Sequence, residues 1–176
     1  MKLMNISIAL AVAFGFAAVA PAQVIIRHGH RPTVISGPTN QTGLNAIQSD
    51  LISAIGSMKS ALPIYDGNRV RAIHAAHNAL VLVDHAIAGA RAAKRPSPTV
   101  TDHVKFANAK SKYNQQQIAA SQTSMEEGLN YLKLAYRDLE ATVGSTPNKQ
   151  GIKAGELIQK SEREAATALA LHGNRA

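Results

Sequence analysis

Alanine recurs at steps of three and four residues between Arg69 and Ala93, and this spacing constrains the fold more than any other feature of the chain. Residues at such steps share one face of an α-helix. Because alanine side chains are small, a neighbouring helix can approach this face unusually closely. The sequence therefore predicts a helix over residues 69–93 that packs tightly against a partner. Its predicted buried seam is Ala72, Ala76, Ala79, Val83, Ala86 and Ala90.

A helix pattern with larger apolar residues precedes this one. It runs from Leu44 to about Leu62, with Thr42 as its candidate N-cap. Pro63 ends this helix because the residue before a proline is driven out of helical geometry. The short turn at residues 63–68 implies that the two helices form an antiparallel hairpin. The predicted seam of the first helix is Leu44, Ile47, Leu51, Ala54, Met58 and Ala61.

The C-terminal part of the chain carries a second hairpin pattern. Thr123 followed three residues later by Glu126 has the form of a capping box, so a helix is expected from there to about Val143. Thr146-Pro147 is a suitable start for a last helix, which continues to about Leu171. The predicted seams are Met125, Leu129, Leu132, Tyr136, Leu139 and Val143, then Ala154, Ile158, Ser161, Ala165 and Ala168.

The two hairpins can be aligned with each other, which suggests an internal duplication. A shift of 85 residues places Gly43-Leu44-Asn45 on Gly128-Leu129-Asn130, and a shift of 82 places Ala72 on Ala154. One gap of three residues in the loop reconciles the two shifts. Common ancestry and similar architecture without ancestry both remain open. Either way, the sequence predicts an all-α fold in which two antiparallel helical hairpins pack as a four-helix bundle with an additional connecting helix.

The predicted organisation of the chain has three parts. Residues 1–22 are expected to be a signal peptide, residues 23–42 a flexible N-terminal tail, and residues 43–172 the helical bundle. Within the bundle, hairpins at 43–93 and 123–172 are joined by a linker and connecting helix at 94–122. The connecting helix is expected from His103 to about Gln122, capped by Thr101 or Asp102.

The N-terminus has the pattern of a secretory signal. Lys2 supplies a positive charge, Ile6–Ala20 is almost wholly apolar, and Ala20-Pro21-Ala22 matches a cleavage site before Gln23. The apolar stretch is short for a transmembrane helix, and no transmembrane span is expected after its removal. The alternative is that it stays uncleaved as an N-terminal anchor. Absence of cysteine excludes disulfides and lipid attachment at the cleavage site. The sequence predicts an exported protein, periplasmic or extracellular.

Positive charge is concentrated in the N-terminal two thirds of the chain. Residues 23–125 carry 11 basic and 4 acidic side chains, whereas residues 126–176 carry 7 of each. A basic patch outside the cytoplasm favours anionic envelope components as partners, and nucleic acid is not expected there. The alternative is a solvated positive face without a partner. The densest basic zone is Arg91, Lys94, Arg95, Lys105, Lys110 and Lys112.

Three histidines, His74, His77 and His85, fall on the helix face opposite the alanine seam and are expected to lie in water. His74 and His77 are one turn apart and could share a metal ion. His28 and His30 in the tail could add ligands. A tight Zn²⁺ site needs three or four protein ligands, so the hypothesis is weak binding of Cu²⁺, Ni²⁺ or Zn²⁺. The alternative is exposed histidines without a ligand, and no other cofactor is expected.

The chain lacks the usual catalytic patterns. It has no cysteine, no Gly-x-Ser-x-Gly elbow and no glycine-rich phosphate loop, and no glutamate is followed three residues later by histidine as in di-iron bundles. Tyr65, Asp66 and Arg69 form a polar cluster at the first turn. Helix capping by Asp66 or Asn68 and a tyrosine lid over the end of the core explain this cluster. The sequence predicts that the protein is not an enzyme.

The turn of the first hairpin contains Gly67 and Arg69 and is followed by the pair Ala72-Ile73. It resembles the turn of small exported bacterial helical-hairpin proteins, a group that includes the His-rich small metal-binding proteins. Their turn often reads Gly-His-Arg before an Ala-Ile pair, and here Asn68 stands in place of the histidine. The resemblance covers the first hairpin and, more weakly, the second. It implies an exported helical-hairpin fold and gives weak support to metal binding.

Three functional hypotheses follow from these features. The leading one is an exported, non-enzymatic helical bundle that binds anionic surfaces of the cell envelope. The first alternative is a periplasmic protein that binds divalent metals through surface histidines. The second is a periplasmic helical chaperone or stress protein, which would leave an apolar groove uncovered when the hairpins pack. Alanine-rich seams also suit packing between copies, so a homodimer remains open.

Overall fold

The computed structural model describes residues 41–89, 92, 94–105, 108–143 and 149–173. Across this part of the chain the regular secondary structure is helical, without any strand, which confirms the all-α prediction. The predicted signal peptide, His28 and His30 lie outside the described residues. No described helix is both long and apolar enough to cross a bilayer. The helices are α1 (Gln41–Ser60), α2 (Asn68–Ala88), α3 (Ala109–Lys112), α4 (Gln115–Val143) and α5 (Lys149–Gly173).

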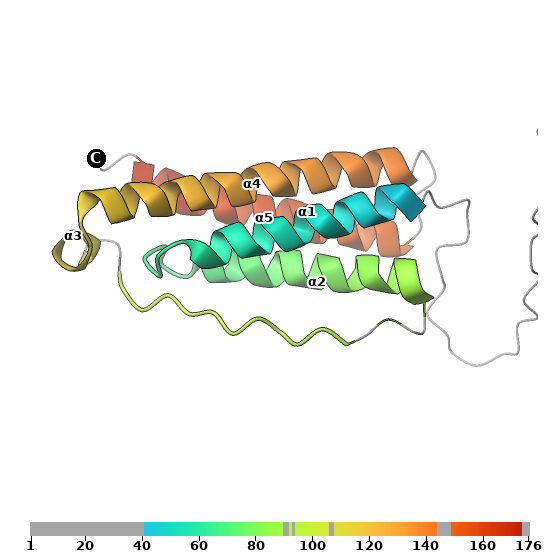
Figure 1. Ribbon diagram of the computed structural model, residues 1–176, viewed down its shortest axis with the longest axis horizontal. Helices are drawn as coiled ribbons and strands as arrows, with labels where there is room; N and C mark the ends of the chain where they lie inside the picture. Colours follow the sequence, from blue (N-terminus) through green and yellow to red (C-terminus); the bar gives the residue numbers. More distant parts are fainter. Residues whose placement is uncertain (1–40, 90–91, 93, 106–107, 144–148, 174–176) are drawn as a thin grey trace, which may run out of the picture. The chain divides into compact units, whose positions relative to one another are not determined.

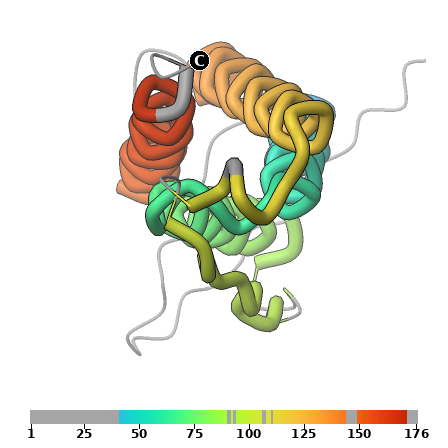
Figure 2. The backbone as a smooth tube through the Cα atoms, turned by 90° about the vertical axis from the view of Figure 1, so that its left-hand side faces the viewer, coloured from blue at the N-terminus to red at the C-terminus, as the bar shows by residue number. Residues whose placement is uncertain are grey.

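Four long helices pack side by side as a bundle, as Figure 2 shows in end view. The closest pairs are α1 with α4 and α2 with α5, while α1–α2 and α4–α5 close the ring. Gly43 at the start of α1 faces Thr142 at the end of α4, so these two helices are antiparallel. The Ser161 hydroxyl of α5 donates a 2.8 Å hydrogen bond to the Ala72 carbonyl of α2. The two hairpins are thus joined through their corresponding helices, and their common ancestry stays a prediction.

The predicted seams of α1, α2 and α5 form the core. All six seam residues of α1 are buried, and so are all five of α5. In α2 the seam from Ala72 to Val83 is buried, Ala86 is partly buried, and Ala90 lies outside the described residues. Helix α2 also ends earlier than expected, at Ala88, where Gly89 adopts a φ of 58°.

The seam of α4 differs from the prediction at three positions, of which Val143 at the end of the helix is only partly buried. Gly128 and Ala135 are buried against the core, whereas Leu129 and Tyr136 are only half-buried at its edge. At Gly128 an added Cβ would lie 2.6 Å from Met58 Cγ and 3.2 Å from the Ala54 carbonyl oxygen. Helix α1 therefore lies so close to α4 that only small residues of α4, such as Gly128 and Ala135, fit where the two helices touch.

Helix α4 begins eight residues earlier than Thr123, so the predicted capping box is wrong. Asn114 and Gln117 form a reciprocal capping box instead, with backbone-to-side-chain hydrogen bonds of 2.8 and 3.0 Å. Thr123 lies inside the helix, where its hydroxyl donates a hydrogen bond to the Ala119 carbonyl.

The predicted connecting helix from His103 to Gln122 is also wrong, because residues 101–105 are not helical and residues 115–122 belong to α4. Within the described part of residues 103–114, the four-residue α3 is the α-helix that is present. Thr42 likewise lies inside α1, not at its N-cap.

The segment between α2 and α4, residues 89–114, is here called the crossover. It returns along α2 on the outside of the bundle, as Figures 1 and 2 show. Near the end of α2, Arg95 forms an ion pair with Asp84. Near the start of α2, the His103 and Val104 N–H groups donate to the Pro63 carbonyl at 3.2 and 3.1 Å. The crossover is thus attached at both ends of the helix that it covers.

Candidate functional site

Arg69 of the polar cluster at the first turn is held by internal hydrogen bonds. The buried Asp102 carboxylate accepts the Arg69 Nε–H and the Gly67 N–H, each at 2.9 Å. The Arg69 guanidinium also donates to the carbonyls of Met58 and Thr101. Asp102 therefore binds the backbone and a side chain at the start of α2. It was expected instead to cap the connecting helix. Buried polar groups that are paired in this way stabilise a fold.

Tyr65 is fully buried beside this cluster. Its hydroxyl lies 2.9 Å from the Ser121 hydroxyl, which also accepts the Leu62 N–H at 2.8 Å. Burial raises the pKa of the Tyr65 phenol, so it stays protonated near neutral pH. The tyrosine joins the first turn to the start of α4 and closes the end of the core.

The crossover carries exposed lysines. Lys94, Lys105 and Lys112 are exposed, and the Lys112 ammonium lies 5.7 Å from the centre of the Tyr113 ring. Arg91 and the side chain of Lys110 lie outside the described residues. Three lysines of the predicted basic zone are thus available to a partner.

Arg95 differs from these lysines because its charge is compensated. Its guanidinium donates to both carboxylate oxygens of Asp84, with 3.1 Å between Nη2 and Oδ1. Gln48 of α1 donates to the same carboxylate at 2.7 Å. Burial opposes ionisation of Asp84, but the hydrogen bonds from Arg95 and Gln48 prevail and hold its pKa below the usual range. Arg95 is therefore an attachment point of the crossover.

The histidines of α2 lie in three different environments. His85 is exposed and His74 is half-buried, whereas His77 is only 9% exposed. The prediction that His77 lies in water is wrong, because the crossover covers the outer face of α2. Neither ring nitrogen of His77 has a hydrogen-bond partner within the described chain. An unpaired buried polar group costs about 1–3 kcal/mol, so this histidine is a candidate for a ligand contact.

His77 lines a groove of about 560 Å³ between α1, α2 and the crossover, here called the His77 groove. Ile52 and Ile55 of α1 and Leu80 of α2 supply its apolar wall. Lys59, Arg95 and residues 96–99 complete it, and no carboxylate among the described residues lines it. Sequence reasoning missed this groove because the residues that form it come from three separate segments.

No group of three or more histidine, cysteine, aspartate or glutamate side chains gathers as a metal site among the described residues. His74 and His77 supply at most two ligands there, and His77 is covered by the crossover. Because His28 and His30 lie outside the described residues, metal binding by the tail and α2 stays a prediction.

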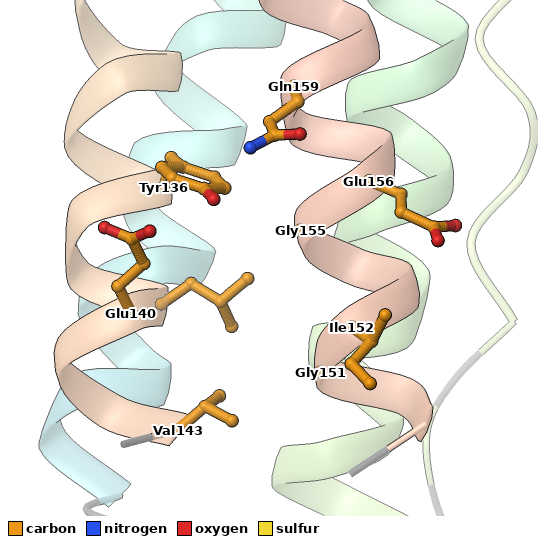
Figure 3. A pocket seen from close by; sticks show the side chains of 9 residues that line it. Tyr136, Glu140, Val143, Gly151, Ile152, Gly155, Glu156 and Gln159 are labelled. Atoms are coloured by element: carbon orange, nitrogen blue, oxygen red, sulfur yellow. The ribbon is translucent and has the colours of Figure 1, made fainter. Parts of the chain in front are cut away.

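A second pocket, of about 460 Å³, opens between α4 and α5, and Figure 3 shows its lining. Gln159 of α5 leans toward the Tyr136 ring of α4, whereas Glu156 points away from the gap. The hydrogen bond to Glu140 raises the pKa of the Tyr136 phenol. The described residues that line this pocket include glutamates and no basic residue, so its charge is opposite to that of the His77 groove.

No family model, curated protein or solved structure matches this chain.

Proposed function

We propose that the protein is an exported, non-enzymatic binding protein that contacts anionic surfaces of the cell envelope through its crossover. The observation that carries this proposal is the exposure of Lys94, Lys105 and Lys112 on one segment whose acidic neighbours are already neutralised. Asp84 is bound by Arg95, and Asp102 is bound by Arg69. The exposed charge that remains on the crossover is positive.

The distribution of charge over the chain supports the same surface. Residues 89–114 contain six basic residues and a single acidic one, Asp102. In contrast, residues 126–176 are balanced, and Lys153 there pairs with Glu156 at 2.9 Å. A local excess of positive charge attracts anionic partners and raises the rate of encounter. The second hairpin has no such excess.

Two further features support the remaining parts of the proposal. The N-terminal pattern of a positive residue, an apolar stretch and Ala20-Pro21-Ala22 favours export, where phospholipid, lipopolysaccharide and cell-wall polymers offer anionic groups. The internal saturation of Arg69 and Asp102 favours a structural role for the polar cluster at the turn. Both features agree with a binding role without catalysis.

Co-sedimentation with phospholipid vesicles tests the proposal. The mature chain is expected to bind vesicles that contain phosphatidylglycerol at low salt and to dissociate as salt screens the charges. A Lys94→Gln, Lys105→Gln, Lys112→Gln variant should bind roughly 100-fold more weakly, because each lysine near an anionic surface contributes about 1 kcal/mol. Phosphatidylcholine vesicles are zwitterionic and have no net charge, so they should retain neither protein.

The matched control removes three exposed lysines from the second hairpin, Lys133, Lys153 and Lys160, by the same change to glutamine. Both triple variants have the same net charge, so only the place of the lost charge differs. Equal binding of the two variants would show that net charge alone attracts the protein. Absence of wild-type binding at low salt to phosphatidylglycerol, lipopolysaccharide and cell-wall material would overturn the proposal.

A further inference from the structure

The His77 groove presents an apolar wall beside groups that carry positive charge or donate hydrogen bonds. Ile52 is 47% exposed there. A volume of about 560 Å³ is typical of pockets that hold small molecules. Such pockets are mostly apolar and use a few polar groups to orient the ligand. The polar groups therefore indicate the chemistry of the ligand.

Lys59 is the unpaired cation of the groove. It forms no ion pair within the described chain, whereas the charge of Arg95 is compensated by Asp84. The described residues that line the groove include no carboxylate, so an anionic group on a ligand would meet no like charge from them. The combination of an unpaired ammonium and an aliphatic wall fits a ligand with one negative group and an aliphatic body.

His77 supplies the second polar contact. Both of its ring nitrogens are buried and lack a partner within the described residues, and a neutral imidazole has one N–H to donate. The part of the crossover above it, residues 96–100, makes no hydrogen bond to the rest of the described chain. The attachments lie on either side, at Arg95 and at Thr101–Asp102. This span can therefore shift without breaking a hydrogen bond, and a ligand oxygen beneath it would reach the imidazole.

We propose that the His77 groove binds a medium-chain aliphatic carboxylate, whose head group accepts a hydrogen bond from His77 and pairs with Lys59 while its chain packs on Ile52, Ile55 and Leu80. This site is separate from the proposed binding of anionic surfaces by Lys94, Lys105 and Lys112. Each activity can therefore fail without the other.

Calorimetric titration with octanoate, below its micelle concentration, tests the site. Octanoate is expected to bind with one-to-one stoichiometry. Acetate lacks the aliphatic chain and octylammonium has the opposite charge, so neither should bind. A His77→Phe variant keeps the buried apolar volume and removes both nitrogens, and its octanoate affinity should fall at least tenfold. Lys59→Gln changes an exposed side chain, so the fold is retained, and it should weaken binding several-fold and remove most of its salt dependence.

Lys153→Gln on α5 is the control for loss of a surface lysine and should leave the affinity unchanged. In the wild-type protein, the NMR signals of the His77 ring should shift in proportion to bound octanoate. No octanoate binding by the wild-type protein would overturn the proposal. Equal affinities of the wild type, His77→Phe and Lys59→Gln would overturn it too, as would octylammonium binding as tight as that of octanoate.

Discussion

Arg69 of α2 and Asp102 of the crossover form a buried ion pair, with 2.9 Å between Nε and Oδ1 and side chains that are only 5% and 4% exposed. They lie 33 residues apart in the sequence. The same carboxylate accepts the Gly67 N–H at the start of α2. This contact therefore joins the crossover to the first hairpin at the point where α2 begins.

Replacement of Asp102 by alanine should destabilise the fold strongly. Arg69 would keep a buried charge without its partner, which typically costs about 3–5 kcal/mol. Urea unfolding followed by circular dichroism measures the loss. Glu156→Ala breaks the exposed Lys153–Glu156 pair and serves as the control, with an expected change below about 1 kcal/mol. A similar small change for Asp102→Ala would contradict the structural role assigned to the pair.

Two glycines in the bundle should respond oppositely to alanine. Gly128 faces Met58 and the Ala54 carbonyl so closely that a Cβ requires a shift of α1 or α4. Overpacking of this kind costs about 1–3 kcal/mol, which exceeds the gain of about 1 kcal/mol in helix propensity. Gly56 of α1 is exposed, with nothing within 4 Å of an added Cβ, so Gly56→Ala should stabilise the protein by about 0.5–1 kcal/mol. Thermal unfolding of both variants checks the opposite signs.

Arg95→Gln should destabilise the protein in a pH-dependent manner. The folded-state pKa of Asp84 lies below the usual 3.8, so its carboxylate adds stability above that pH, and this stability is lost as pH falls through the folded-state value. Removal of Arg95 removes the first of the hydrogen bonds that lower the pKa. The variant should be about 1 kcal/mol less stable at pH 7, a modest loss because Arg95 is 34% exposed.

This deficit should shrink when the pH falls below about 4, where Asp84 becomes protonated in the unfolded chain. Unfolding midpoints at a series of pH values measure it. Arg137→Gln is the matched control, because Arg137 is 71% exposed and forms an ion pair with its neighbour Asp138. A deficit that is independent of pH would show that Arg95 acts through packing instead of charge.

Glu162→Gln should have the opposite effect on stability. Burial raises the pKa of Glu162 above the usual 4.5, and its Oε1 atom has no hydrogen-bond partner among the described residues. The ionised carboxylate therefore destabilises the fold above its folded-state pKa, and this penalty disappears below 4.5, where both states are protonated. The variant should be more stable than the wild type at pH 7 and equal to it near pH 3 in the same unfolding series.

Glu164 provides the contrast for this prediction. It lies two residues away, and its carboxylate accepts a 2.8 Å hydrogen bond from Arg71. Glu164→Gln should lose a small part of the stability at pH 7, below about 1 kcal/mol, because Arg71 is exposed. Stabilisation by both variants would indicate a general benefit of removing acidic charge.

The helices α1, α2 and α5 and the core seams that they bury could be predicted from the sequence. Periodicity is a local property of each helix. Ile47 of α1, Ala76 of α2 and Ala165 of α5 each lie on the inward face of their own helix, and this follows from helix geometry alone. The start of α4 could not be chosen in the same way, because the residues at Asn114–Gln117 and at Thr123–Glu126 both satisfy the capping pattern. Likewise, the burial of Gly128 could not be predicted from the sequence of α4, because it results from the close packing of α1 against α4.

The burial of His77 could not be predicted from the local sequence pattern. Its spacing correctly places it away from the alanine seam, but a position opposite the core is exposed only if nothing else covers it. The crossover covers it because Arg95 meets Asp84 at one end of α2 and Asp102 meets Arg69 at the other. Helical periodicity in the sequence determined the face of each helix that turns inward. Contacts between residues distant in the sequence decided which outward residues are covered, because such contacts form only when the whole chain has folded.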